Sequence, residues 1–424
     1  MSGTPIRGFG WWTLTFLVVA NMIGAGVFTT SGFTLASLRE PSLVILAWLV
    51  GGVIALCGAY SYGLLVKRMP VSGGEYAFLS QAAHPFLGFI AGWISLLAGF
   101  SGAIAFAAVS FEAYLPELLP RGILAALLVI SGAMIHGART HLGAGIQNAT
   151  VALKLLMLAV FLAVSLWSLN SGTWNYDALP PLPDESPALA FAQALVWISL
   201  SYSGFNAAVY VAGEAASPNV VARALLTGTA LVALLYLLLN TVFVLAPPAS
   251  EIAGQPDVAA IAALAIGGEG FAQFTRLVIA FALLTSVLSM MMAGPRVYGK
   301  MADDGLLPKF FALHPERTWP AVCLQLVVAL ILVFAGSLQD LLSYLGLTLS
   351  LSTALSVACL FLGDPSRRIT GLRALPPLLF ILATLTTATL LVIRDPWQAL
   401  GTGLTLVIGG LAYFLLGRPS KTSP

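Results

Sequence analysis

Two glycines flank an alanine in the middle of a long apolar segment near the N-terminus. Residues 21–28 read Asn-Met-Ile-Gly-Ala-Gly-Val-Phe, in a stretch without charged residues that starts after Arg7. A glycine costs roughly 1 kcal/mol relative to alanine inside a helix, so this pattern favours either close helix packing or a break. A break would expose the amides of Gly24, Ala25 and Gly26 at the positive end of a half-helix, which is a site for a carboxylate.

A later apolar segment contains a similar interruption. Residues 201–206 read Ser-Tyr-Ser-Gly-Phe-Asn, again in the middle of a segment long enough to cross a membrane. The free carbonyls at the end of a half-helix carry the negative end of its dipole and accept hydrogen bonds from an ammonium group. Because two interruptions at matching positions of two halves indicate a binding site in the middle of the membrane, we favour breaks at both positions.

Lys154 is the third residue that could carry chemistry. It lies eight residues after the start of an apolar segment at 146, which is roughly 12 Å along a helix. A lysine at such a depth costs about 2.5–3.5 kcal/mol on insertion scales, so it is a candidate functional group. To reach the membrane surface instead, the side chain would have to extend over most of its length.

The composition is that of a membrane protein. Hydrophobic residues make up 59% of the chain and charged residues 8%, whereas about a quarter of a soluble domain is charged. The apolar segments are continuous and do not alternate, which excludes a transmembrane β-barrel. Cys57, Cys323 and Cys359 fall in apolar segments and predict no disulfide framework. A formal charge of +2 without a basic run predicts no nucleic-acid partner.

Charge-poor runs predict an all-α polytopic membrane protein with about twelve transmembrane helices. The predicted spans are 11–36, 42–66, 85–114, 121–138, 146–168, 190–212, 222–246, 271–295, 320–337, 340–362, 374–393 and 397–416. Loops rich in lysine and arginine stay in the cytoplasm. With both termini in the cytoplasm, all of the 19 lysines and arginines lie on that side except five. These five are Arg39, Arg121 and Arg394 on the outer side, and Lys154 and Arg276 within spans.

The spans divide the chain into two halves of five helices. Residues 1–169 form the first half, 170–189 a proline-rich extracellular connector, 190–362 the second half, and 363–424 the last two spans with a cytoplasmic C-terminus. An odd number of spans in each half predicts halves of opposite orientation, an inverted repeat in which the interrupted first and sixth spans correspond.

A pocket in the middle of the membrane lies about fifteen residues from either helix end. In the third span this selects the small residues Ala98, Gly99, Ser101 and Gly102. Glu112 lies at the outer surface by the same argument, as does Arg276, which either screens substrates or pairs with an outer acid. Residues 70–78 form a cytoplasmic loop or an interfacial helix. No carboxylate is then expected at the depth of the pocket.

Several short motifs occur together along most of the chain. They are Ile-Gly-Ala-Gly-Val-Phe at 23–28, Ser-Gly-Gly-Glu-Tyr at 72–76, Tyr-Ser-Gly-Phe-Asn at 202–206, Gly-Glu-Ala-Ala-Ser-Pro at 213–218 and Asp-Gly-Leu-Leu-Pro at 304–308. As a set they resemble the amino acid–polyamine–organocation superfamily of secondary carriers, which share the leucine-transporter fold. The motif at 202–206 is most similar to that of the L-type branch, whose members carry neutral amino acids.

This resemblance implies how a zwitterionic substrate binds. Its carboxylate would bind the amides of Gly24, Ala25 and Gly26, and its ammonium would bind free carbonyls around both breaks. Those carbonyls belong to the stretches Met22–Ile23 and Tyr202–Phe205, the latter including Ser203 and Gly204.

The resemblance also assigns coupling and gating residues. Lys154 would take the place of the ion that sodium-coupled relatives bind, with Ser286 and Ser289 as candidate partners. Either it releases a proton during transport, or it stays charged and the carrier is an exchanger or facilitator. Leu200 stands where many relatives have an aromatic gate, so Phe205 and Tyr202 are alternative gates. Asn206 is expected to hold the unwound segment in place.

The sequence therefore predicts a secondary active transporter of neutral L-amino acids that works by alternating access, as an exchanger or proton-linked carrier. The alternatives are a carrier of cationic amino acids or polyamines, or a non-transporting sensor on the same fold. A channel is disfavoured because the chain has no filter-like loop or charged ring. An enzyme is disfavoured because no catalytic set converges at one depth. We expect no cofactor and no metal site, a monomer that requires no ancillary subunit, and a location in the cell membrane.

Overall fold

The computed structural model describes residues 8–116, 119–138, 144–169, 174–181, 186–312, 319–362 and 368–416. Parts of the predicted connector, 170–173 and 182–185, lie outside the described residues, as do the two ends of the chain. In chain order the helices are α1 (Trp11–Met22), α2 (Gly26–Leu38), α3 (Pro41–Arg68), α4 (Gly74–Ala82), α5 (Pro85–Ile94), the π-helix η1 (Ser95–Gly102), α6 (Ala103–Ala113), α7 (Ile123–Ala138), α8 (Ala144–Leu169), α9 (Pro187–Tyr202), the 3₁₀-helix η2 (Ala207–Glu214), α10 (Pro218–Leu245), α11 (Ala249–Ile252), α12 (Val258–Asp303), η3 (Lys309–Phe311), α13 (Trp319–Ala335), α14 (Leu338–Ala358), η4 (Cys359–Phe361), η6 (Gly371–Ala374), α15 (Leu375–Arg394) and α16 (Pro396–Leu416).

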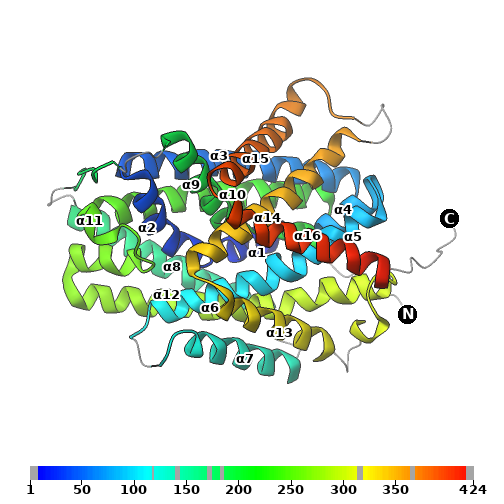
Figure 1. Cartoon of the computed structure of the whole chain (residues 1–424), viewed down its shortest axis with the longest axis horizontal. Helices are drawn as coiled ribbons and strands as arrows, with labels where there is room; N and C mark the ends of the chain where they lie inside the picture. The colour runs from blue at the N-terminus through cyan, green and yellow to red at the C-terminus, as the bar shows by residue number, and fades with distance from the viewer. Residues whose placement is uncertain are drawn as a thin grey trace.

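Most of these helices run along the long axis of the molecule, with α11 at one end and α4 at the other (Figure 1). Among the described residues, eight helical segments are long and apolar enough to cross a membrane, and α1 with α2 forms a ninth that is bent by 42° at its break. Three further apolar helices are shorter. The prediction of an all-helical polytopic membrane protein is confirmed, while the count of twelve crossings stays a prediction.

Local sequence explains where many helices begin. Proline occupies the first turn of α3, α5, α9 and α10, where its missing N–H would have had no helical partner. Ser337 and Asp340 form a reciprocal capping box at the start of α14. At most positions, the ends of the helices agree with the ends of the predicted spans to within a few residues.

The broken helices pack in the centre of the molecule. α1 packs on α10, α2 on α9, and α3 on both α9 and α10. Hydrogen bonds connect these helices, because the Trp48 indole donates to Ser31 Oγ over 2.9 Å and the Ser31 hydroxyl donates to Asn240 Oδ1 over 2.6 Å. Side-chain partners of this kind satisfy polar groups that lipid cannot.

Two elements, α12 and the third span, differ from the sequence-based expectation, and residues 70–78 follow the helical one of its two alternatives. α12 starts at Val258, well before the predicted residue 271, and turns at Gly268, where φ is 70°. The alanine-rich stretch at its start has high helix propensity, although we assigned it to an outer loop. Residues 74–82 form the helix α4, and the third span contains a π-helix at 95–102 that the sequence did not indicate.

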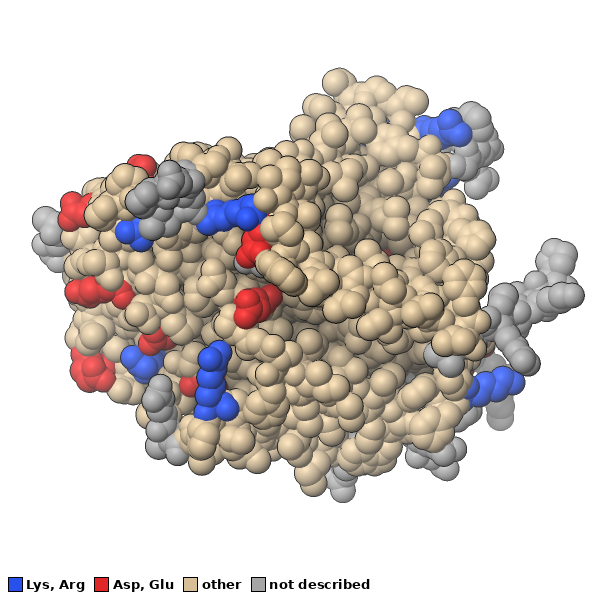
Figure 2. Space-filling view, viewed as in Figure 1, with Lys and Arg blue, Asp and Glu red and all other residues tan. Residues whose placement is uncertain are grey.

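Charged side chains are unevenly distributed on the surface. On the face in Figure 2, acidic and basic side chains lie together toward the end that carries α11, and a few basic side chains lie at the opposite end. The surface between the two ends is almost free of charge. This pattern is typical of a protein whose middle is surrounded by lipid.

Candidate functional site

The first span is broken where the glycines predict it. α1 ends at Met22, α2 begins at Gly26, and the three residues between them are not helical. The amides of the first turn of α2 have no partner within that helix. The amide of Gly24 is different, because it donates to the Met22 carbonyl over 2.8 Å. Ala25 and Gly26 therefore supply the available amides at this break.

The second predicted break is also present. α9 ends at Tyr202 and η2 starts at Ala207, with an unwound segment at 203–206 between them. Gly204 has a φ of 100° in this segment, a conformation that residues other than glycine rarely adopt. The carbonyls of the last turn of α9 therefore lack the amide donors that a continuing helix would supply. The Leu200 carbonyl still accepts from the Ser203 amide over 3.0 Å.

The two breaks contact each other through main chain. A Cβ at Gly204 would lie 2.7 Å from the carbonyl atoms of Asn21, and a Cβ at Gly26 would lie 2.7 Å from the Ser201 Cα. Both distances are too short for any side chain, so glycine is required at both positions. A hydrogen bond of 3.0 Å between the hydroxyls of Thr30 and Ser201 joins the same two helices.

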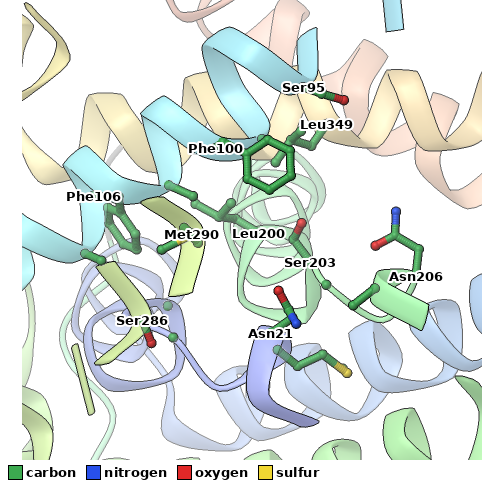
Figure 3. Close-up of a pocket in the computed structure, with 18 of the residues that line it drawn as sticks. Asn21, Ser95, Phe100, Phe106, Leu200, Ser203, Asn206, Ser286, Met290 and Leu349 are labelled. Carbon is green, nitrogen blue, oxygen red and sulfur yellow. The ribbon is translucent and has the colours of Figure 1, made fainter. Parts of the chain in front are cut away.

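A cavity of about 130 Å³ lies beside this crossing point. Its walls come from the two breaks, from the third span, and from α12 and α14 (Figure 3). The predicted site residues that line it are Met22, Gly24, Ala25, Gly26, Leu200, Ser203, Gly204, Asn206, Ser286 and Ser289. The residues that our sequence analysis missed include Asn21, Glu75, Ser95, Phe100, Phe106, Ser201, Tyr210, Met290, Leu349 and Thr353.

Three of the predicted substrate-binding residues do not line this cavity, and neither does Lys154. The Tyr202 hydroxyl donates to the Trp48 carbonyl over 3.1 Å, away from the cavity. The Phe205 ring packs against the rings of Tyr62 and Phe380. The Ile23 carbonyl faces Lys154 instead.

Two of the three aromatic side chains that line the cavity come from the third span, and the other is Tyr210 of η2. Phe100 lies in the π-helix η1 and Phe106 in α6, and both rings border the cavity (Figure 3). Tyr202 and Phe205, our alternative candidates for an aromatic gate, point elsewhere. Because the third span is apolar on all sides, its sequence did not reveal which face points inward.

The carbonyls at the end of α1 are already engaged by other groups. The Met22 carbonyl accepts from the Tyr236 hydroxyl over 2.5 Å and from the Gly24 amide. The Ile23 carbonyl accepts from the Lys154 ammonium over 3.0 Å. A carbonyl oxygen has two lone pairs, so the Met22 carbonyl has no free position. At the second break, the Gly204 carbonyl accepts from the Ala207 amide and the Asn206 carbonyl from the Val209 amide, each over 2.9 Å. Each of these oxygens therefore keeps one lone pair for a further donor.

Lys154 is 3% exposed and points at the first break. Besides the bond to Ile23, its ammonium donates to Ser286 Oγ over 3.3 Å, and the Ser286 hydroxyl donates to the Ala282 carbonyl. The lysine thereby links α8, the end of α1 and α12. Its hydrogen-bond partners among the described residues are neutral oxygens, so a charge on the ammonium would be stabilised by dipoles that converge on it.

Glu75 contradicts our expectation that no carboxylate lies at the depth of the pocket. This residue of α4 lines the cavity and is 4% exposed. Its Oε1 accepts from the Tyr62 hydroxyl over 2.8 Å and from the Asn206 amide, and its Oε2 accepts from the Tyr210 hydroxyl over 2.7 Å. The bond from Asn206 ties the unwound segment to α4.

Glu112 and Arg276, which the sequence analysis places at the outer surface, do not line this cavity. The Glu112 carboxylate accepts from the amides of Gly122 and Ala125 over 2.6 and 2.8 Å, so it caps the start of α7. Arg276 forms an ion pair of 3.5 Å with Asp257, the residue before α12. Burial raises the pKa of the Asp257 carboxyl, and the Arg276 guanidinium acts in the opposite direction. Of the two roles expected for Arg276, the structure shows the pairing with an acid.

Comparison with known proteins gives consistent results. The family model described as amino acid permease matches residues 9–416. The serine/threonine exchanger SteT of Bacillus subtilis is 24% identical, over 76% of this chain and 75% of that protein. The large neutral amino acids transporter small subunit 2 of Homo sapiens is 25% identical, over 95% and 78%. The branched-chain amino acid permease BcaP of Lactococcus lactis is 28% identical, over 72% and 70%.

Proposed function

Because this multi-pass membrane protein belongs to the amino acid permease family and transports amino acids, we propose that it binds one neutral amino acid at the crossing of its two broken helices. The observation that carries this proposal is the cavity bordered by both breaks, with the amides of Ala25 and Gly26 on one side and carbonyls that can accept a further hydrogen bond on the other. The relatives described as a serine/threonine exchanger, a large neutral amino acid transporter and a branched-chain permease support a neutral substrate.

In this proposal the substrate carboxylate binds the amides of Ala25 and Gly26. The first turn of α2 provides unpaired N–H groups and the positive end of the helix dipole. The ammonium binds carbonyls of the unwound segment around Ser203 and Gly204, because the Met22 and Ile23 carbonyls have partners within the protein. The substrate side chain points toward Phe100, Phe106 and Met290, which border the rest of the cavity.

Lys154 takes the place of a coupling cation in this proposal. Its position between α1 and α12, with bonds to Ile23 and Ser286, supports that role. If the ammonium keeps its proton, the carrier exchanges one amino acid for another. If it releases the proton during each cycle, the carrier is proton-linked. Uptake into liposomes separates the two, because exchange requires amino acid inside and proton-linked transport responds to a pH gradient.

The remaining assignments extend the same proposal. Residues 1–169 and 190–362 form the two inverted halves, and the end with α4 faces the cytoplasm together with both termini. The protein resides in the cell membrane. A monomer performs the transport without an ancillary subunit, although one relative bears the description small subunit. Chemical cross-linking of the purified protein in lipid tests this last assignment.

A binding screen tests the proposed substrate class directly. The purified full-length protein is heated in detergent with each standard amino acid in turn, because a ligand that binds only the folded state raises the melting temperature. We expect neutral amino acids to raise it, and arginine, lysine and polyamines to leave it unchanged. A shift with the cationic compounds alone would contradict the proposal. Binding of a neutral amino acid without uptake into liposomes would instead identify a sensor.

Replacing Gly24 by alanine is expected to weaken substrate binding about tenfold without lowering stability. Gly24 borders the cavity, and a Cβ at this position would meet no protein atom within 4 Å. The added methyl group would therefore occupy space that the substrate needs. Isothermal titration measures the affinity. Gly403→Ala in α16, another position with open space, is the matched control. Unchanged affinity in Gly24→Ala would show that the substrate does not approach this break.

A further inference from the structure

Glu75 brings a negative charge to the cavity from outside both broken helices. It lies in the first turn of α4, between the second and third spans. Its side chain is buried and borders the cavity together with Ser203, Gly204 and Asn206 of the second break. It is the one aspartate or glutamate in the described lining of this cavity.

Three hydrogen-bond donors converge on this carboxylate. Tyr62, Asn206 and Tyr210 donate three hydrogen bonds to its two oxygens. An ionised carboxylate is purely an acceptor with about four acceptor positions, so three converging donors fit that form. Such donors stabilise the anion but do not cancel its charge. A buried charge without a counter-charge is costly, and one acceptor position is left over.

We propose that Glu75 supplies the counter-charge for the ammonium group of the substrate, and that its bond to Asn206 positions the carbonyls that bind this group. The proposal rests on the proposed function, in which the ammonium lies at the unwound segment next to Asn206. The dipole of a helix end is equivalent to only about half an elementary charge. A full negative charge in a site from which water is largely excluded adds attraction over several ångströms.

The test compares an amino acid with its 2-hydroxy acid analogue. The analogue has the same carboxylate and side chain, but a neutral hydroxyl replaces the ammonium. The amino acid with the largest shift in the screen is used, and both ligands are titrated into the full-length protein. Glu75→Gln keeps the size of the side chain and an oxygen acceptor but removes the charge. We expect it to weaken binding of the amino acid about tenfold or more, while the affinity for the hydroxy acid changes less than about threefold.

The ratio of the two affinities distinguishes charge from a purely structural role. Loss of structure would weaken both ligands equally and leave the ratio unchanged, and that result would overturn the proposal. Glu75→Asp keeps the charge but places it one methylene farther from the cavity. The ratio of the two affinities should then lie between those of the wild-type protein and Glu75→Gln. If Glu75→Gln does not fold, this variant decides, and a wild-type ratio in it would overturn the proposal.

Two controls complete the experiment. Glu251→Gln removes an exposed acid of α11 and should leave both affinities unchanged. Tyr210→Phe removes one donor to Glu75 and keeps the charge. It should weaken the binding of both ligands and retain the wild-type ratio of the two affinities. A lowered ratio in this variant would overturn the proposal. If the wild-type protein binds no amino acid at all, the proposed function is wrong. If the wild-type protein and Glu75→Gln bind the amino acid equally well, only the role proposed for Glu75 is wrong.

Discussion

Replacing Lys154 by methionine is expected to lower the initial rate of amino acid uptake about tenfold or more, while the protein still folds. Methionine has a similar length but cannot donate a hydrogen bond to the Ile23 carbonyl or to Ser286 Oγ. A buried carbonyl that loses its partner costs about 1–3 kcal/mol, and this carbonyl belongs to the break that holds the substrate. Uptake of radiolabelled substrate into liposomes measures the rate.

The pH dependence of the Lys154→Met variant gives additional information. A proton-linked carrier would lose its response to a pH gradient in this variant, whereas an exchanger would show a lower rate at every pH. Lys309→Met removes an exposed lysine of η3 and should leave uptake unchanged. Uptake by Lys154→Met at the wild-type rate and with the wild-type pH dependence would contradict the role assigned to the ammonium.

Replacing Gly204 by alanine should both destabilise the protein and abolish substrate binding. The φ of 100° at this position costs a residue with a side chain about 1–3 kcal/mol. The added Cβ would also lie 2.7 Å from the main chain of Asn21, which belongs to a packed helix and cannot move aside easily. We expect a lower melting temperature and no detectable binding in the titration.

Gly410→Ala serves as the control for Gly204→Ala, because a Cβ at Gly410 meets no atom within 4 Å and α16 is an ordinary helix there. A Gly204→Ala variant with normal melting and normal uptake would show that the second break is not held in the conformation described above. The contrast with Gly24→Ala is informative, because there binding should weaken while the melting temperature stays the same.

Much of the fold could be predicted from the sequence because lipid permits few structures. Continuous apolar runs must form helices there, so the predicted span 42–66 corresponds closely to α3 at Pro41–Arg68. Both breaks were predicted as well. A glycine destabilises a helix, so its presence within an apolar segment indicates that the helix is interrupted or closely packed there. The start of α12 was not predicted, because Glu251, Asp257 and Glu269 resembled an outer loop.

The site was predicted less completely, and for a different reason. The main-chain groups of the breaks follow from positions along the chain, but the direction of a side chain depends on how its helix is rotated. Phe100 and Phe106 were missed on that account. Glu75 was missed because its donors Tyr62, Asn206 and Tyr210 come from distant segments. The pair of glycines before Glu75, both with positive φ, is the local signal that the chain turns inward there.

The contact between Gly204 and Asn21, with that between Gly26 and Ser201, restricts how the molecule can change shape. Where two main chains touch without side chains between them, neither can tilt without displacing the other. We therefore expect α1, α2 and α9 to move together as one crossed unit during transport. A passage that widens at one surface would then be expected to narrow at the opposite one.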